Sequence, residues 1–289
     1  MKHLLLLFLV IVSTALLAQE DADPFDLYGP PGSVTFGNLK DALKEPQAVY
    51  KLKISNQPID PKLLPKISKL DQLQVLQLNQ NNLTQLPAEF TGLSNLIYFA
   101  SIENQLTSLP KDIGNLSMLT EVHLYNTKLD SLPTDIAYLG RLKALEIQNN
   151  QADTFYFPNS FGYLKSLNSI LLYNTTLDTL PSSFSEFKKL KSVTFSKCGI
   201  KEIPKTVAKI ATLEMLILDD NKLTELNKRV FKLKGLKYLS VRNNQITKIP
   251  DMISTLQNLE VLDLRGNPGF KEFDIAVVKA LLPKCNVLY

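Results

Sequence analysis

The sequence predicts an α/β solenoid, in which a curved parallel β-sheet forms the concave face and short helical or 3₁₀ segments form the convex face. Leucine is by far the commonest of the 289 residues. Apolar residues follow the pattern Leu-x-x-Leu-x-Leu-x-x-Asn-x-Leu, which recurs about ten times along the chain. Its spacing is nearly constant, and self-similarity at a fixed period of 20–50 residues is typical of repeat architectures. The units begin at Val49, Leu73, Leu96, Leu119, Leu142, Leu167, Leu190, Leu213, Leu236 and Leu259.

The composition is that of an ordinary folded protein. Hydrophobic residues make up 45% of the chain and charged residues 21%, which argues against intrinsic disorder. The formal net charge of +4 comes from scattered side chains without a continuous basic stripe, so we expect no nucleic-acid partner.

The N-terminus predicts export. Lys2 precedes an apolar run from Leu4 to Val12, and small residues then lead to Ala18. This layout is typical of a secretory signal peptide at residues 1–18, cleaved after Ala18, with an uncleaved anchor as the alternative. The run is too short for a comfortable membrane span, so we expect no stable span after cleavage and a periplasmic, cell-surface or secreted location.

Each unit contains a short strand followed by a turn. In Leu76-x-Leu78 the side chains alternate, so both leucines face the core while the residues between them face the concave side. The ninth position of the unit predicts a ladder of buried amides that satisfy backbone groups at the turn. This structural ladder consists of Asn81, Asn104, Asn150, Asn221, Asn244 and Asn267, with Gln57 at the first unit and the weaker substitutes Thr127, Thr175 and Cys198.

A second motif, Leu-Pro-x-x-Ile-x-x-Leu, follows the turn, as at Leu109-Pro110 with Ile113. Proline fixes φ at its entry, and apolar residues three apart favour a short helical or 3₁₀ segment on the outer face. The fifth unit departs from this pattern, because it has two extra residues around Phe155-Tyr156. That insertion is read either as a locally packed bulge or as a second contact surface.

The regions outside the repeats are interpreted as caps. We expect a leader and N-terminal cap at 19–48, repeats at 49–269 and a C-terminal cap at 270–289. Within the caps, the pattern predicts a short helix from Asn38 to Lys44 and a closing helix after Phe270 that ends at Pro283.

These motifs resemble the leucine-rich repeat family over roughly 49–270. The outer motif is similar to that of Ras-pathway scaffolds and plant disease-resistance-like proteins. The stretch from Ala42 to Leu52 resembles the entry segment of exported bacterial leucine-rich repeat proteins, which implies a bacterial source. The family implies a recognition scaffold, and its fold alone names no partner.

The sequence predicts no enzyme, no cofactor and no metal site. His123 is the only histidine after the signal segment, and its alternating position predicts a solvated surface side chain. Glu121 and Glu146 fall on adjacent strands, which leaves glycoside hydrolysis as a remote alternative. Cys198 and Cys285 are about 14 Å or more apart by strand spacing alone, so we expect two free, buried thiols and no disulfide.

The concave face is the predicted binding site, because aromatic and aliphatic side chains recur there with a polar surround. Strand propensity alone is the competing explanation for those residues. We expect a monomer that binds a protein ligand, with a glycan or cell-envelope polymer as the alternative. The predicted ligand-binding residues are Tyr98, Ile102, His123, Tyr125, Glu146, Leu171, Tyr173, Met215, Ile217, Asp219, Tyr238 and Arg242.

Overall fold

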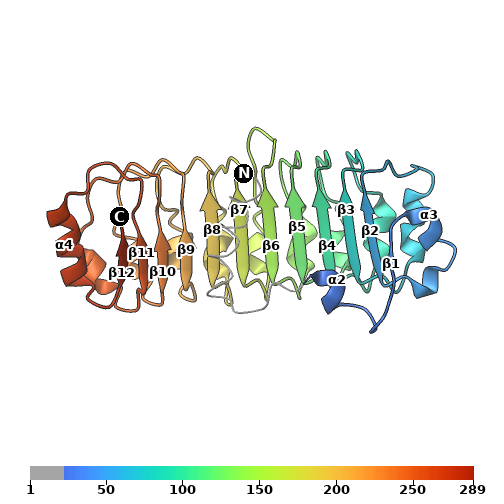
Figure 1. Cartoon of the computed structure of the whole chain (residues 1–289), viewed down its shortest axis with the longest axis horizontal. Helices are drawn as coiled ribbons and strands as arrows, with labels where there is room; N and C mark the ends of the chain where they lie inside the picture. The colour runs from blue at the N-terminus through green and yellow to red at the C-terminus, as the bar shows by residue number, and fades with distance from the viewer. Residues whose placement is uncertain (1–22) are drawn as a thin grey trace.

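The computed structural model describes residues 23–289, which form one elongated solenoid (Figure 1). Twelve parallel strands make a single open, curved sheet in which spatial order equals chain order. This confirms the predicted fold class. The predicted signal peptide at 1–18 and the first residues of the leader lie outside the described residues. Within 23–289, no helix has the length and apolarity needed to span a membrane.

The strands are short and evenly spaced along the chain. Their bounds are β1 Thr35–Phe36, β2 Lys51–Ser55, β3 Val75–Asn79, β4 Tyr98–Ile102, β5 Glu121–Tyr125, β6 Ala144–Gln148, β7 Ser169–Tyr173, β8 Ser192–Ser196, β9 Met215–Ile217, β10 Tyr238–Ser240, β11 Val261–Asp263 and β12 Asn286–Leu288. The register aligns equivalent residues of successive units, so Leu76, Phe99 and Val122 form one row, each at most 1% exposed. Stacking of such rows produces one continuous core.

Short 3₁₀ helices cover the convex side behind the sheet (Figure 1). Pro133, with φ −66°, directly precedes η5, and the buried Ile136 within that helix packs into the core. The bounds are η1 Pro46–Ala48, η2 Leu64–Lys69, η3 Ala88–Gly92, η4 Ile113–Asn115, η5 Thr134–Tyr138, η6 Phe161–Tyr163, η7 Ser182–Glu186, η8 Val207–Lys209, η9 Val230–Lys232 and η10 Asp251–Thr255.

After each of the strands β2 to β11 the chain passes through a residue in the left-handed region, a periodic feature that the sequence interpretation missed. Non-glycine residues at this position include Asn126 and Asn243, with φ 55° and 50°, and Gly266 occupies it in the last unit. Asparagine and glycine tolerate this conformation best, which explains their recurrence immediately before the ninth position.

The side chains at the ninth position differ in how many backbone groups they satisfy. The Asn104 carbonyl oxygen accepts from the backbone amides of Asn81 and Leu83, and its amide group donates to the Leu78 carbonyl at 3.0 Å. Asn81 donates to the Gln57 carbonyl, but its own carbonyl oxygen is buried without a hydrogen-bond partner among the described residues. The side chains at the ninth position therefore form hydrogen bonds in most units, but the number of these bonds differs from unit to unit.

Additional elements extend the sheet at both ends. Before the repeats come α2 (Pro24–Leu27), β1 and α3 (Leu39–Ala42); after them come α4 (Glu272–Leu281) and β12. The sequence predicts only a leader before Asn38, so α2 and both terminal strands are additions by the structure. Outside the repeat motif, strands of two and three residues carry too short an alternating pattern to be recognised in a sequence.

The insertion in the fifth unit forms a packed bulge. Phe155 is fully buried and bridges to Leu177, whereas the neighbouring Tyr156 is 49% exposed. The Phe155 ring contacts Phe157 at 5.1 Å between ring centroids, and Phe157 contacts Phe161 at 4.4 Å. Aromatic packing therefore accounts for the two extra residues.

Both cysteines are free thiols, but only Cys198 is buried as expected. Cys198 is fully buried and lies within 3.6 Å of the Leu172 carbonyl. Cys285 is only half-buried, because it lies in the turn between α4 and β12 rather than inside a repeat.

Candidate binding surface on the concave sheet

Ten of the twelve predicted ligand-binding residues lie within strands of the sheet. The other two, Asp219 and Arg242, follow β9 and β10 by two residues. The side chains of Tyr98, Ile102, Tyr125, Tyr173 and Tyr238 are half-buried, so part of each aromatic or aliphatic group reaches the surface. They lie on β4, β5, β7 and β10, which spreads them along the sheet (Figure 1).

Three apolar members of the predicted set are less exposed than expected. Leu171, Met215 and Ile217 are 6%, 2% and 3% exposed. Each of them lies between the paired residues of the two neighbouring strands. Met215, for example, lies between Ser192 on β8 and Tyr238 on β10. Neighbouring strands lie about 4.8 Å apart, so lateral packing removes much of such a side chain from solvent. Leu171, Met215 and Ile217 therefore present little apolar surface to solvent in this structure.

A polar cluster forms where β4, β5 and β6 lie side by side. His123 lies between two carboxylates, with Nε2 at 3.4 Å from Glu121 Oε2 and Nδ1 at 3.1 Å from Glu146 Oε2. The Tyr125 hydroxyl donates to Glu146 Oε2 at 2.5 Å. Tyr98 stacks on the His123 ring, with centroids 4.9 Å apart. We call Tyr98, Glu121, His123, Tyr125 and Glu146 the central cluster.

The register explains why these side chains meet. His123 is opposite Ala100 on β4 and Glu146 on β6. The small Ala100 leaves space beside the imidazole, and Tyr98, two residues earlier on the same strand, fills it. The side chain of His123 is only 13% exposed, so the expectation of a solvated surface histidine is wrong.

The charges of the cluster stabilise one another. Burial lowers the pKa of His123, but hydrogen bonds and charges from Glu121 and Glu146 outweigh it and raise that pKa to about 9. The hydrogen bond from His123 is the main cause of the lowered pKa of Glu121. For Glu146, burial raises the pKa, and the hydrogen bond and charge of His123 reverse this to a net lowering. At neutral pH the cluster therefore contains two carboxylates and one imidazolium.

This charge state does not suit glycoside hydrolysis. That reaction needs one carboxylic acid with a raised pKa and a second carboxyl group facing it across the scissile bond. The pKa values of Glu121 and Glu146 are both lowered, and His123 occupies the space between their carboxylates. The arrangement is that of a fixed polar surface.

The segment before the repeats contributes to this surface, which the sequence interpretation missed. The Tyr28 hydroxyl donates to Glu121 Oε1 at 3.2 Å, and the Gly29 amide donates to Gln74 Oε1 at 2.9 Å. Phe25 in α2 is 8% exposed and lies under Lys53 Nζ, 5.4 Å from the ring centroid. Figure 1 shows α2 in front of the sheet near β4. In the sequence, the only indication of this contact is the presence of Phe25 and Tyr28 in a proline-rich segment. No periodic pattern relates these two residues to the repeats.

A second polar group lies near the C-terminal end of the sheet. Asp219 Oδ1 accepts from the Ser240 hydroxyl at 2.5 Å and from the Arg242 amide at 2.9 Å. Asp263 is fully buried and pairs with the Arg265 guanidinium through two nitrogens, at 2.9 and 2.5 Å.

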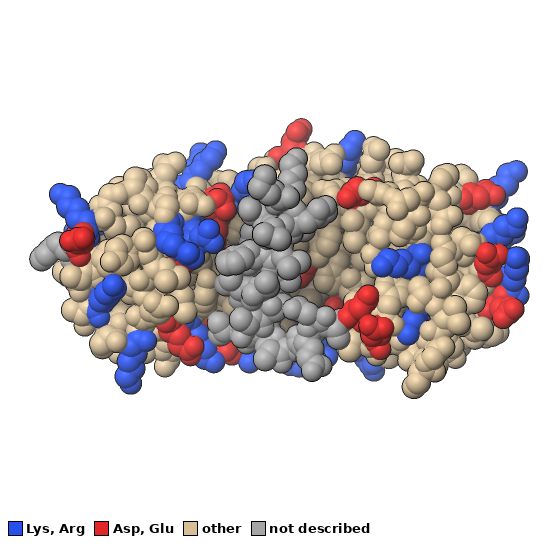
Figure 2. Space-filling model, viewed as in Figure 1, with Lys and Arg blue, Asp and Glu red and all other residues tan. Residues whose placement is uncertain are grey.

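Figure 2 shows basic and acidic side chains interspersed over the visible face of the described residues, without a continuous stripe of either sign.

The burial of Asp219 predicts a pH-dependent stability. Burial raises the pKa of this carboxyl from 3.8 to about 6, and the nearby Asp263 charge adds to this against hydrogen bonds from Ser240 and the Arg242 amide. A raised carboxyl pKa stabilises the folded state below pH 4, and this contribution is lost as the pH rises through 6. We expect Asp219→Asn to gain about 1–3 kcal/mol in unfolding free energy, relative to the natural chain, between pH 4 and pH 7.

Urea unfolding of both proteins at pH 4, 5, 6 and 7 measures this difference. Asp220→Asn, which removes the carboxylate of the adjacent half-buried residue, is the matched control for the change in net charge. A constant difference between Asp219→Asn and the natural chain across the series would contradict the assigned role of Asp219.

Comparison with known proteins supports the repeat architecture. Models of the leucine rich repeat match residues 211–268 and 72–93. No curated protein sequence matches the chain significantly. The ectodomain of the receptor kinase GASSHO1/SCHENGEN3 from Arabidopsis thaliana, solved with CASPARIAN STRIP INTEGRITY FACTOR 2, is 25% identical with a TM-score of 0.60. The match covers 86% of this chain and 34% of the receptor chain.

Two further solved structures share the architecture. The plant peptide hormone receptor RGFR1, in complex with RGF2, is 25% identical with a TM-score of 0.56, over 76% of this chain and 40% of the receptor. The leucine-rich repeat domain of the type III effector XopL is 21% identical with a TM-score of 0.58, over 86% of this chain and 79% of that domain, and shows the fold alone. This chain thus spans well under half the length of either plant receptor chain. The repeat matches and the twelve-stranded parallel solenoid establish the chain as a leucine-rich repeat protein.

Proposed function

We propose that this protein is an exported, non-catalytic recognition module that binds a peptide or protein segment across its concave sheet. The observation that carries the proposal is the central cluster, whose aromatic and charged side chains are held in place by one another before any ligand arrives. Side chains that are already ordered lose little conformational entropy on binding.

The charge of the cluster indicates the chemistry of the ligand. Two carboxylates and one imidazolium leave a net negative charge at the middle of the sheet. The Tyr98 and Tyr125 rings beside these charges provide apolar surfaces, and aromatic faces attract cations. A lysine or arginine side chain of an extended peptide satisfies both features.

The relatives add support of a coarser kind. RGFR1 is named as a peptide hormone receptor in complex with RGF2, so the shared solenoid supports peptide recognition in that protein. This chain matches only 40% of the length of that receptor, so the receptor's ligand is a guide to the class of ligand and not to its identity. The export component rests on the sequence pattern of residues 2–18.

Peptide selection tests the concave site. A displayed library of random linear peptides, panned against the natural chain, should yield peptides enriched in lysine or arginine. Tyr125→Ala with Tyr173→Ala should weaken the selected peptides at least about thirtyfold, because aromatic anchors dominate such interfaces. Glu146→Gln, which keeps the side-chain shape, should weaken lysine- and arginine-containing peptides most.

Tyr138→Ala with Tyr163→Ala is the matched control, since these two tyrosines are 72% and 60% exposed on the convex side. This variant should bind the selected peptides as the natural chain does. Thermal unfolding of all variants separates lost binding from lost folding. Equal peptide affinity for the folded concave and convex variants would refute the proposed surface.

A further inference from the structure

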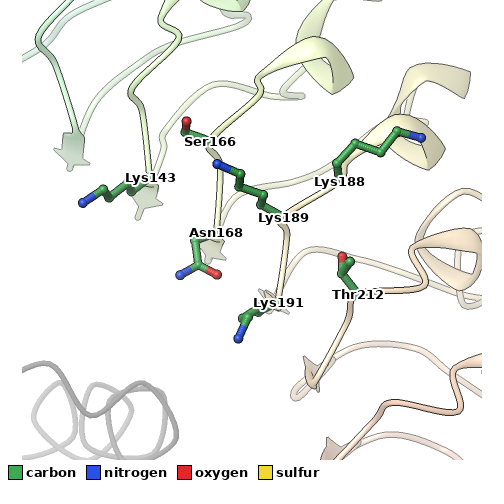
Figure 3. Close-up of a pocket in the computed structure, with 7 residues that line it drawn as sticks. All are labelled: Lys143, Ser166, Asn168, Lys188, Lys189, Lys191 and Thr212. Atoms are coloured by element: carbon green, nitrogen blue, oxygen red, sulfur yellow. The ribbon is translucent and has the colours of Figure 1, made fainter.

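A separate pocket of about 370 Å³ lies at the edge of the sheet where β6, β7 and β8 begin (Figure 3). Lys143, Asn168 and Lys191 are the residues immediately before these three strands. Lys188 and Lys189 come from the turn before Lys191, and Ser166 from the turn before Asn168. Figure 3 shows Lys189 extending toward Ser166, whereas Lys188 points away.

The backbone around this pocket is open. In other units the turn before the strand closes through one hydrogen bond, as from the Leu142 amide to the Leu139 carbonyl at 3.1 Å. The equivalent bonds from Leu167 and Leu190 are absent among the described residues. The residues that end the preceding 3₁₀ helices explain the opening: Leu164 and Phe187 have ψ values of 108° and 130°, whereas Leu139 has 73°.

Each open turn leaves a backbone amide next to residues that line the pocket. Leu167 lies between Ser166 and Asn168, and Leu190 lies between Lys189 and Lys191. Groups of backbone amides without internal acceptors commonly bind anions. The amides of Leu167 and Leu190 are therefore candidate hydrogen-bond donors to an anion in this pocket.

The charge around the pocket is only partly neutralised. Glu214 pairs with Lys191 at 2.9 Å and Glu186 lies 3.8 Å from Lys188. Within residues 23–289, no carboxylate lies within 4.0 Å of Lys143 or Lys189. The side-chain oxygen Oδ1 of Asn168 is buried and has no hydrogen-bond partner in the same part of the chain.

We propose that this pocket binds a phosphate group, held by Lys143 and Lys189 and by the backbone amides of Leu167 and Leu190 in the two open turns. Lysine binds phosphate as a point charge, and backbone amides donate hydrogen bonds to its oxygens. The side-chain oxygen Oδ1 of Asn168 accepts a hydrogen bond from a hydroxyl group, either of a protonated phosphate or of a sugar that carries the phosphate. The site is distinct from the central cluster and does not depend on the concave ligand.

Titration of the ¹⁵N-labelled natural chain with inorganic phosphate, glucose 6-phosphate and glucose tests the proposal by NMR. The amide signals of Leu167 and Leu190 should shift with both phosphates and stay unchanged with glucose. Tighter binding of glucose 6-phosphate identifies a sugar-borne phosphate, whereas equal affinities identify the free ion. Unchanged signals for both amides would overturn the proposal.

A pair of lysine variants separates the pocket from general charge attraction. Lys143→Ala with Lys189→Ala should weaken phosphate binding at least about tenfold, because it removes the two ammonium groups without carboxylate partners. Lys62→Ala with Lys111→Ala makes the same change in net charge at two exposed lysines elsewhere and should leave the affinity unchanged. Equal loss in both double variants would show attraction by net charge alone and would overturn the site.

Discussion

Replacing Asn221 with alanine is expected to lower the free energy of unfolding by about 3–5 kcal/mol. Its carbonyl oxygen accepts from the backbone amides of Cys198 and Ile200, at 3.0 and 3.1 Å. Its amide group donates to the carbonyls of Phe195 and Leu218. Alanine leaves these buried backbone groups without partners, and each unsatisfied group costs about 1–3 kcal/mol.

Urea unfolding followed by circular dichroism measures this loss. Asn95→Ala is the matched control, because Asn95 is exposed and makes one side-chain hydrogen bond, to the Asp71 carbonyl. It should cost less than about 1 kcal/mol. Comparable losses in the two variants would mean that the ninth position has no special role in joining successive units.

Replacing Gly162 with alanine is expected to destabilise the protein by about 3 kcal/mol or more. Gly162 is buried in η6, and a Cβ atom there would overlap the backbone carbonyl of Ser183 in η7. Backbone atoms cannot rotate away as a flexible side chain can, so the two units must separate. Separation would disturb the Phe161 and Phe184 rings, which stack across the same two units at 5.5 Å. Overpacking of this kind typically costs 1–3 kcal/mol and occasionally more.

Gly140→Ala provides the comparison for this effect. A Cβ atom at Gly140 would lie 4.0 Å from its nearest neighbour, the Tyr138 carbonyl oxygen, which is an ordinary contact. Its effect on the unfolding free energy should stay within about 1 kcal/mol of zero. If thermal and urea unfolding show similar stability for both variants, then η6 and η7 are not packed at this position as described.

The repeat architecture was predictable because it depends on residue types at fixed intervals. Leu76 and its equivalents face the core whatever surrounds them, since alternation along a strand sets their direction. The Pro-x-x-Ile spacing likewise indicated the convex 3₁₀ segments, as the buried Ile136 illustrates. The left-handed position before the ninth residue was also visible in principle, as a recurrence of asparagine.

The candidate site was only partly predictable. Tyr98, Tyr125 and Glu146 could be assigned to the concave face from alternation alone. The contacts of His123 with Tyr98 and Glu146 join neighbouring strands, and each partner is more than twenty residues away in the chain. Whether His123 is solvated or enclosed depends on the small Ala100 and the stacked Tyr98 beside it, and no motif expresses that combination.

By itself the sequence determined the fold of this protein, because the repeat specifies which side chains enter the core and where each turn falls. Only the tertiary structure decided how the surface side chains combine. It placed Tyr28 against Glu121, buried Met215 and Ile217, and left the turns beside Lys189 open. The core follows local periodicity, whereas contacts on the surface depend on strand register and on single departures from the repeat, which periodicity does not encode.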